Sequence, residues 1–370
     1  MLSYLLDEFR HERASHAASR ACLFMRTIVI LAILILAPLA CRAEAVVDLY
    51  VGEATVVDQG GAERKRALPL ALENVLQKLS GLRELEDYPL LYPALERAPE
   101  ILLSYHYSKT GLTLSDGGEV EELRLVAHFA KSPVDEMARA LLLPLWQPQR
   151  QPLTVWLIID DGLDRRIMPV EFGYTQQSME DVARRRGLPL QWPSADAEGV
   201  YPVDDQILWG GYTEDLAASR NEGVLIAAAR REGPEWGLRI NLGYLGQHRT
   251  WRLNDIDLQT ALTEGMQQAI DQIAAVNTIA ASDLGSWQQE MTVSGLGGAE
   301  DYRRCLNYLQ AISVVEAVAV MAAQPGTVTF RLMLSALPRH LEDSIDAGGV
   351  LERSAAEGRY VLVEDLPDDA

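Results

Sequence analysis

Apolar residues recur along this chain with strand-like and helix-like spacing in three successive blocks. The first block, residues 46–150, predicts a short strand at 46–50 and two paired strands at 103–109 and 123–129. A helix that ends at Gly81 precedes the pair. Its apolar face has five members: Leu68, Leu72, Val75, Leu76 and Leu79. The block therefore predicts an α+β unit of strand, helix and hairpin.

The second block, residues 151–285, alternates strands with helices. Residues 153–159 are almost continuously apolar, which is typical of a strand buried on both faces. A helix is predicted at 214–222 and an apolar strand at 224–229, and residues 236–242 then alternate as a half-exposed strand. A long amphipathic helix closes the block. This order predicts an α/β unit with an antiparallel edge.

The third block, residues 286–370, follows the order strand, helix, strand, strand, helix, strand. Its two central strands are predicted at 314–321 and 328–334. This βαββαβ order predicts a small ferredoxin-like sandwich. The Pro- and Gln-rich stretch 144–152 separates the first two blocks. The fold class expected is thus mixed α+β and α/β, with three small units after an N-terminal signal.

The N-terminal region carries the pattern of an export signal. Residues 27–40 form an uncharged apolar run that is shorter than the roughly 20 residues of a spanning helix. Arg26 precedes this run, and the small residues Ala43 and Ala45 follow it. This arrangement is typical of a secretory signal peptide with cleavage after Ala43 or Ala45. Residues 1–45 are therefore expected to be absent from the exported protein.

Two alternatives concern the same region. Three acidic residues lie ahead of the apolar run, where a signal peptide carries positive charge: Asp7, Glu8 and Glu12. We interpret residues 1–24 as an over-extended start and Met25 as the true one. Cys41 follows Leu39 and Ala40 in a partial lipobox, so lipidation of Cys41 is the alternative to ordinary cleavage.

Composition narrows the class of partner. The chain has 370 residues, with 53 acidic against 33 basic side chains, a formal charge of −20 and a pI near 4.7. Such a surface argues against nucleic acid or an anionic membrane as a partner. Of the three cysteines, only Cys305 would remain after cleavage, so no internal disulfide is expected. Cys305 is expected to be buried.

Paired carboxylates are the main candidates for chemistry. Asp160 and Asp161 follow the buried strand at 153–159, at the end where open α/β sheets place their ligands. Oxygen ligands of this kind suit a divalent cation. Acidic residues before a glycine are equally typical of a turn, and no third ligand is apparent from the spacing. Asp204 and Asp205 present the same ambiguity.

Other motifs favour structural roles. The sequence Gly295-x-Gly297-Gly298 lacks the Gly-Lys-Ser/Thr ending of a P-loop and predicts a tight turn. The run 184–186 is all arginine at the end of a predicted helix, where it complements the helix dipole. No G-x-S-x-G elbow and no histidine pair at metal-ligand spacing occurs. The sequence therefore predicts no cofactor, catalytic residue or metal ligand.

Four stretches resemble a known family: VVDQ at 56–59, KLSG at 78–81, SYHY at 104–107 and PLTVWLIIDD at 152–161. They resemble an uncharacterised proteobacterial family called domain of unknown function 2066 (DUF 2066). The resemblance covers most of residues 46–277. It implies a secreted envelope protein of Gram-negative bacteria with no assigned activity, and it supplies no active-site residues.

The sequence thus predicts a periplasmic cell-envelope protein that acts as a non-enzymatic binding or scaffolding module. Its expected partners are envelope proteins, with membrane contact only during export. One alternative is a carboxylate-dependent hydrolase or metal-binding enzyme that uses Asp160 and Asp161. A second alternative is an envelope assembly factor anchored through a lipidated Cys41. The expected division is 46–150, 151–285 and 286–370, and the oligomeric state is left open.

Overall fold

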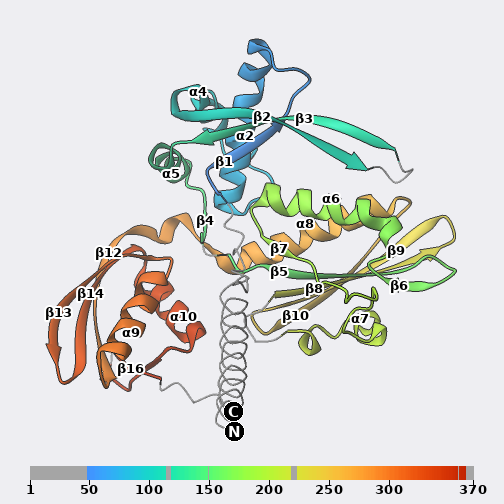
Figure 1. Ribbon diagram of the computed structural model, residues 1–370. Coiled ribbons are helices and arrows are strands. Elements are labelled where there is room, and N and C mark those ends of the chain that lie inside the picture. The colour runs from blue at the N-terminus through green and yellow to red at the C-terminus, as the bar shows by residue number, and fades with distance from the viewer. Residues whose placement is uncertain (1–47, 114–117, 149, 218–222, 357, 364–370) are drawn as a thin grey trace, which may run out of the picture. The chain divides into compact units, whose positions relative to one another are not determined.

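A computed structural model describes residues 48–113, 118–148, 150–217, 223–356 and 358–363 (Figure 1). The residues of the predicted export signal, Met25, Cys41, Ala43 and Ala45, lie outside these ranges. Within the ranges, no helix is both long enough and apolar enough to cross a membrane. The described residues form a mixed α/β protein with several sheets, which confirms the predicted class at this level.

The first sheet is antiparallel, in the order β1-β3-β2, and helix α2 packs against it. These elements are β1 (Val51–Thr55), α2 (Gly61–Ser80), β2 (Leu102–Thr113) and β3 (Glu119–Phe129). The predicted helix and hairpin are confirmed, and Gly81 ends α2 with φ +70°. The strand predicted at 46–50 was placed too early. Gly52 allows β1 to lie close to α2. Any larger residue at this position would overlap the backbone of Ala71.

Three short helices complete this part of the chain: α3 (Leu91–Leu95), α4 (Ala98–Ile101) and α5 (Lys131–Ala140). The chain then forms β4 (Leu145–Trp146), which pairs with β11 (Thr278–Ile279). The Pro- and Gln-rich stretch thus contributes a short paired strand. Trp146 within it is buried in the core beside the second sheet.

The second sheet has the order β10-β9-β8-β5-β6, and β7 also pairs with β5. Its strands are β5 (Leu153–Asp160), β6 (Arg165–Ile167), β7 (Leu190–Gln191), β8 (Gly223–Glu232), β9 (Glu235–Tyr244) and β10 (Gln247–Asp255). β5 runs parallel to β7 and β8, and the remaining pairs are antiparallel. The central strands β5 and β8 are apolar on both faces, as predicted, because both faces are covered.

Helices α6 (Gly173–Arg186) and α8 (Leu258–Asn277) cover one face of this sheet, and the short helix α7 (Asp205–Gly210) covers part of the other (Figure 1). The helix predicted at 214–222 was wrong over its described residues. The chain there forms only a 3-10 turn, η2 (Thr213–Asp215), and another such turn, η1 (Val170–Phe172), precedes α6. Helix α7 was missed because its six residues bury only Leu208.

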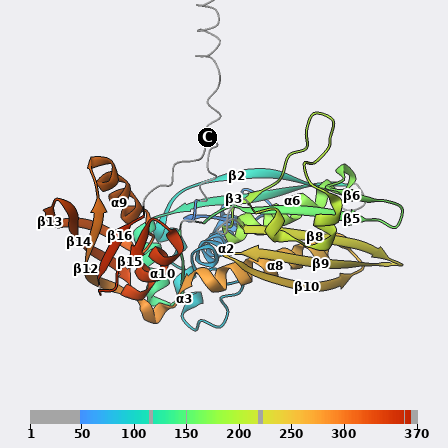
Figure 2. The same ribbon diagram turned by 90° about the horizontal axis from the view of Figure 1, so that it is seen from below.

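The third sheet has the order β13-β14-β12-β16-β15, with β12 parallel to β16. Its elements, after the turn η3 (Ala281–Asp283), are β12 (Leu284–Leu296), α9 (Ala299–Ala311), β13 (Val315–Gln324), β14 (Gly326–Ala336), α10 (Pro338–Gly348), β15 (Leu351–Arg353) and β16 (Arg359–Leu362). Both helices pack on one face around the fully buried Phe330 (Figure 2). Strand β13 therefore lies at one edge of this sheet.

Candidate binding sites

The carboxylate of Asp161 is hydrogen-bonded within a turn. It follows β5, and one of its carboxylate oxygens accepts the backbone N–H groups of Leu163 at 2.9 Å and Asp164 at 3.0 Å. The other oxygen accepts a hydrogen bond from Arg166 at 3.0 Å. These backbone hydrogen bonds and the nearby guanidinium lower the pKa of Asp161. The carboxylate is thus an ionised turn residue whose acceptor sites are in use.

The other acidic candidates also have partners. Asp160 accepts a hydrogen bond from Arg230 at 3.1 Å, and Asp205 accepts one from Arg165 at 2.6 Å. Asp204 caps helix α7 by accepting the N–H of Gln206 at 2.8 Å. In the described ranges, no group of three His, Cys, Asp or Glu side chains is placed to hold a metal ion. The structure therefore brings Asp160 and Asp205 to arginines.

These arginines belong to a larger group that we call the arginine cluster. Three of its arginines surround Trp209 of α7, namely Arg165, Arg230 and Arg239, and the fourth is Arg252, whose charge acts on Arg239. The guanidinium carbons of Arg165 and Arg230 lie 5.0 and 4.9 Å from the centre of the Trp209 ring. That of Arg239 lies 6.0 Å away. At these distances each cation is attracted to the face of the indole ring.

Strand pairing explains why the four arginines converge. They come from β6, β8, β9 and β10, and Arg252 lies directly opposite Arg239 in the register of β9 with β10. Directly opposed residues of an antiparallel pair place their side chains on the same face, with Cβ atoms roughly 5 Å apart. Asp160 lies opposite both Arg230 and Arg165 in the register of its own strand. The two arginines without such a carboxylate neighbour are Arg239 and Arg252.

The charges within the arginine cluster are unbalanced. Neither Arg239 nor Arg252 forms an ion pair with a carboxylate in the described part of the chain. Arg239 donates to the backbone carbonyl of Trp209, and its buried Nε has no acceptor among the described residues. Burial, followed by the charges of Arg252 and Arg230, lowers the pKa of Arg239. Two cations thus lie side by side without a described counterion.

A second unsatisfied donor lies on the same face of β9. The side chain of Asn241, two residues beyond Arg239, is buried and accepts a hydrogen bond from Thr250 at 2.9 Å. Its amide nitrogen has no described acceptor. Guanidinium and amide groups donate to carboxylate and phosphate oxygens, and paired arginines hold such anions strongly. The chemistry that these donors support is therefore anion binding.

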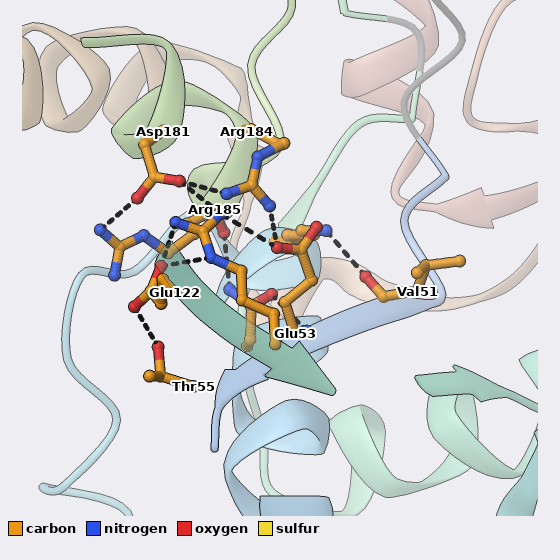
Figure 3. Close-up of polar contacts among 10 residues, drawn as sticks. Val51, Glu53, Thr55, Glu122, Asp181, Arg184 and Arg185 are labelled. Carbon is orange, nitrogen blue, oxygen red and sulfur yellow. Dashed lines mark hydrogen bonds and ion pairs between the residues drawn. The ribbon is translucent and has the colours of Figure 1, made fainter. Parts of the chain in front are cut away.

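A separate ion-pair network joins the first sheet to helix α6. The buried Arg124 of β3 lies 2.5 Å from Glu122, 2.7 Å from Asp181 and 3.6 Å from Glu53. Arg184 contacts both Glu53 and Asp181 (Figure 3). This network includes a third cation, since Arg185 lies 2.5 Å from Asp181. Three arginines face three carboxylates, and their ion pairs join the two elements.

The arginine run at the end of α6 thus does more than complement the helix dipole. Arg186 donates to the carbonyl of Gly81 at 2.8 Å and to Asp271 of α8 at 2.6 Å. Arg184 and Arg185 belong to the network described above. Sequence reasoning missed these long-range partners because the spacing of arginines along one helix contains no information about carboxylates on other elements.

A cleft of about 400 Å³ is lined in part by Tyr50, Lys131 and Asp135. The Tyr50 hydroxyl donates to Asp135 at 2.8 Å and accepts a hydrogen bond from Lys131 at 2.6 Å. Burial raises the pKa of Tyr50, and Lys131 is paired with Asp135 at 2.9 Å. The phenol therefore stays protonated at neutral pH. Tyr50 is consequently not a ready base for catalysis.

The glycine-rich turn before α9 is filled by the chain itself. The carboxylate of Asp301 accepts the backbone N–H of Gly297 at 2.8 Å. A phosphate at that position would compete with this carboxylate. The predicted structural role of the turn agrees with this contact.

Comparison with known sequences corrects the family resemblance. A family described as "Domain of unknown function (DUF8605)" matches residues 43–147. This is a different family from DUF 2066, so the resemblance drawn from short stretches was wrong. Those stretches are only four to ten residues long and lie in a loop, a helix end and two strands, so they carry little information about family. The matched region corresponds to the first sheet and its helices.

Among curated proteins, no sequence matches this chain. Among solved structures, a crystal structure of the Protein Y N-terminal domain from Thermus thermophilus is similar over 34% of this chain and 99% of that chain. The sequence identity is 11% and the TM-score is 0.20. A TM-score this low supports no argument about fold or function.

Proposed function

We propose that this protein is a non-enzymatic binding or scaffolding module of the bacterial cell envelope, and that the arginine cluster is its binding surface. The observation that carries the proposal is the pair Arg239 and Arg252. Both lie on one sheet face with no described carboxylate partner, in a chain whose net charge is −20. Like charges directly opposite on paired strands are destabilising. An anionic ligand would offset this cost.

The ligand class that fits is a carboxylate or phosphate group presented by a partner. Guanidinium groups bind both anions through paired hydrogen bonds, and Trp209 adds an aromatic surface beside them. The strongly acidic remainder of the chain would repel an extended polyanion such as nucleic acid. A short acidic segment of an envelope protein is therefore the partner we favour.

The cellular setting is part of the same proposal. Export to the periplasm, with cleavage after Ala43 or Ala45, rests on the sequence pattern alone. We also propose three structural units over 46–150, 151–285 and 286–370. The third sheet supports the last of these, because its order β13-β14-β12-β16 is the order of a ferredoxin-like sandwich. N-terminal sequencing of the exported protein tests the cleavage position.

The two alternatives receive less support. An enzyme or metal centre at Asp160 and Asp161 would have to displace Arg230 and Arg166 from these carboxylates. Attachment through Cys41 stays a sequence prediction, since that residue lies outside the described ranges. Loss of membrane fractionation in a Cys41→Ser variant would favour lipidation.

Calorimetric titration of the full chain with hexaglutamate and with inorganic phosphate tests the binding proposal. We expect Arg239→Gln and Arg252→Gln each to weaken binding at least tenfold. Arg249→Gln is the matched control. Arg249 lies on β10, as Arg252 does, but it is paired with Leu242 and points to the other face of the sheet. It should change the affinity less than twofold.

Salt dependence provides a second readout. Binding should weaken as ionic strength rises, since the contact is between charged groups near the surface. The proposal fails if neither probe binds at low salt. It also fails if Arg249→Gln weakens binding as much as Arg252→Gln does, because the loss would then reflect total charge and not the cluster.

A further inference from the structure

Two histidines meet on the outer face of the first sheet. His106 of β2 lies opposite Val126 of β3, and His128 follows two residues later on β3. Because Ala127 and Phe129 are buried in the core with α2, the alternation of β3 places His128 on the opposite face, together with His106. The centres of the two imidazole rings lie 5.9 Å apart, and the ring planes are inclined by 36°. Strand pairing thus joins two residues that no spacing along the sequence connects.

Both imidazole rings are available to a ligand. The other histidines of the described ranges have partners, since His248 is hydrogen-bonded to a threonine at 2.8 Å and His340 to an aspartate at 2.9 Å. His106 and His128 form no side-chain hydrogen bond or ion pair with a described residue. His106 is exposed and His128 is half-buried. In its neutral form, each ring therefore offers a nitrogen lone pair that no described donor occupies.

We propose that His106 and His128 together bind a divalent transition metal ion, with Cu²⁺ as the preferred ion and water in the remaining coordination positions. Imidazole nitrogen is a good ligand for copper, nickel and zinc, and Cu²⁺ binds most tightly among the divalent first-row ions. The site lies on the first sheet, so it is independent of the anion-binding surface proposed on the second sheet.

The separation of the rings fits shared coordination. A metal–nitrogen distance of about 2.0–2.1 Å places the centre of each ligating ring roughly 3.2 Å from the ion. Two rings on one ion then have centres roughly 4.5 Å apart when they meet at a right angle and roughly 6.4 Å apart when they are in line. The observed 5.9 Å lies within this range. Rotation about the side-chain bonds is therefore enough to bring both rings to one ion.

Charge and ligand type favour a transition metal as the occupant. The positions directly opposite the two histidines on the neighbouring strands are uncharged: Val51, Ser104 and Val126. The chain carries a net charge of −20, which attracts cations at long range. Calcium and magnesium prefer oxygen ligands, and no third His, Cys, Asp or Glu of the described ranges joins the pair. The two nitrogens thus select a transition metal, and the water positions leave it exchangeable.

Calorimetric titration of the full chain with CuCl₂ tests this inference. We expect His106→Gln and His128→Gln each to weaken binding at this site at least tenfold, so that each variant binds one ion per chain fewer than the wild type over the same concentration range. The titration is read as a difference from the wild type because His11 and His16 precede the described residues. His248→Gln is the matched control, because His248 is an exposed histidine of the second sheet. It should bind copper as the wild type does.

Protection from diethyl pyrocarbonate, measured by peptide mass spectrometry, distinguishes one shared ion from two separate ones. Cu²⁺ should slow the modification of both His106 and His128 in the wild type, and Mg²⁺ should not. In His106→Gln the protection of His128 should be lost, and in His128→Gln that of His106. Urea unfolding of each variant without metal checks that the fold is intact.

Three results overturn the inference. The first is equal copper binding by the wild type and both variants. The second is protection of one histidine that survives the substitution of the other, because each ring would then bind copper by itself. The third is a wild type in which Cu²⁺ protects neither His106 nor His128.

Discussion

Removal of the Arg124 side chain gives a quantitative test of the ion-pair network between the first sheet and helix α6. In Arg124→Met, three partly buried carboxylates lose their shared cation: Glu53, Glu122 and Asp181. Their side chains are 17, 22 and 13% exposed, against 9% for Arg124. Breaking a buried pair by removing one partner costs about 3–5 kcal/mol. Because Arg184 and Arg185 remain, we expect about 3 kcal/mol.

Urea unfolding followed by tryptophan fluorescence measures this cost. With an m value of about 3 kcal/mol per M, a loss of 3 kcal/mol lowers the unfolding midpoint by about 1 M. Arg97→Met is the control, since the pair of Arg97 with Glu100 is 61 and 67% exposed. Exposed pairs contribute about 0–1 kcal/mol, so the control should move the midpoint only slightly.

The pH dependence sharpens the test. Burial raises the pKa of Asp181, but the arginines around it outweigh burial and lower the pKa below its ordinary 3.8. The stabilisation from Asp181 is therefore present above about pH 4 and is lost as the pH falls through its folded pKa. The cost of Arg124→Met should be largest at pH 7 and smaller at pH 3, where the pH has fallen below the ordinary pKa of Asp181. An equal cost at both pH values, or a cost equal to that of Arg97→Met, would refute the assigned role.

Two further predictions concern buried titratable groups. Burial lowers the pKa of Lys78 from its ordinary 10.5 to about 8. Between these two pH values the unfolded chain binds more protons than the folded chain does. The free energy of unfolding should therefore rise with pH in this range. Between pH 7.5 and 9.5 the wild type should gain about 2 kcal/mol relative to Lys78→Met, and parallel stability curves in urea would contradict this. Burial also raises the pKa of the Cys305 thiol to about 11. Peptide mass spectrometry should then find Cys305 alkylated at pH 8 only after unfolding, and rapid labelling of the folded chain would disprove its burial.

The main elements of the fold could be predicted from the sequence where apolar periodicity is strong. The start of the buried strand predicted at 153–159 and the end of the helix at Gly81 were both correct. Both elements have long apolar patterns. The helix expected at 214–222 was wrong over residues 214–217, where the chain forms a 3-10 turn and Leu216 and Ala217 pack against the core without a helix. Propensity alone is a weak guide when tertiary contacts decide the structure.

The arginine cluster was beyond sequence reasoning for a geometric reason. Arg165 and Arg252 are far apart in the chain, and only the pairing order of the second sheet brings them to one face. The available signal was Arg239, a charged residue within the alternating strand at 236–242. Asp160 and Asp205 were ambiguous candidates in the sequence, and their arginine partners depend on the fold of the second sheet. Register cannot be derived from one strand considered alone.

The Arg124 network also extends beyond the part of the chain that the DUF8605 match covers. The DUF8605 match covers residues 43–147 and so includes Glu53, Glu122 and Arg124, but neither Asp181 nor Arg184. A fragment cut at the family boundary would expose to water a charged surface that the whole chain neutralises. Such a fragment would have a different net charge at this surface, and these charged side chains would be open to contact with another molecule.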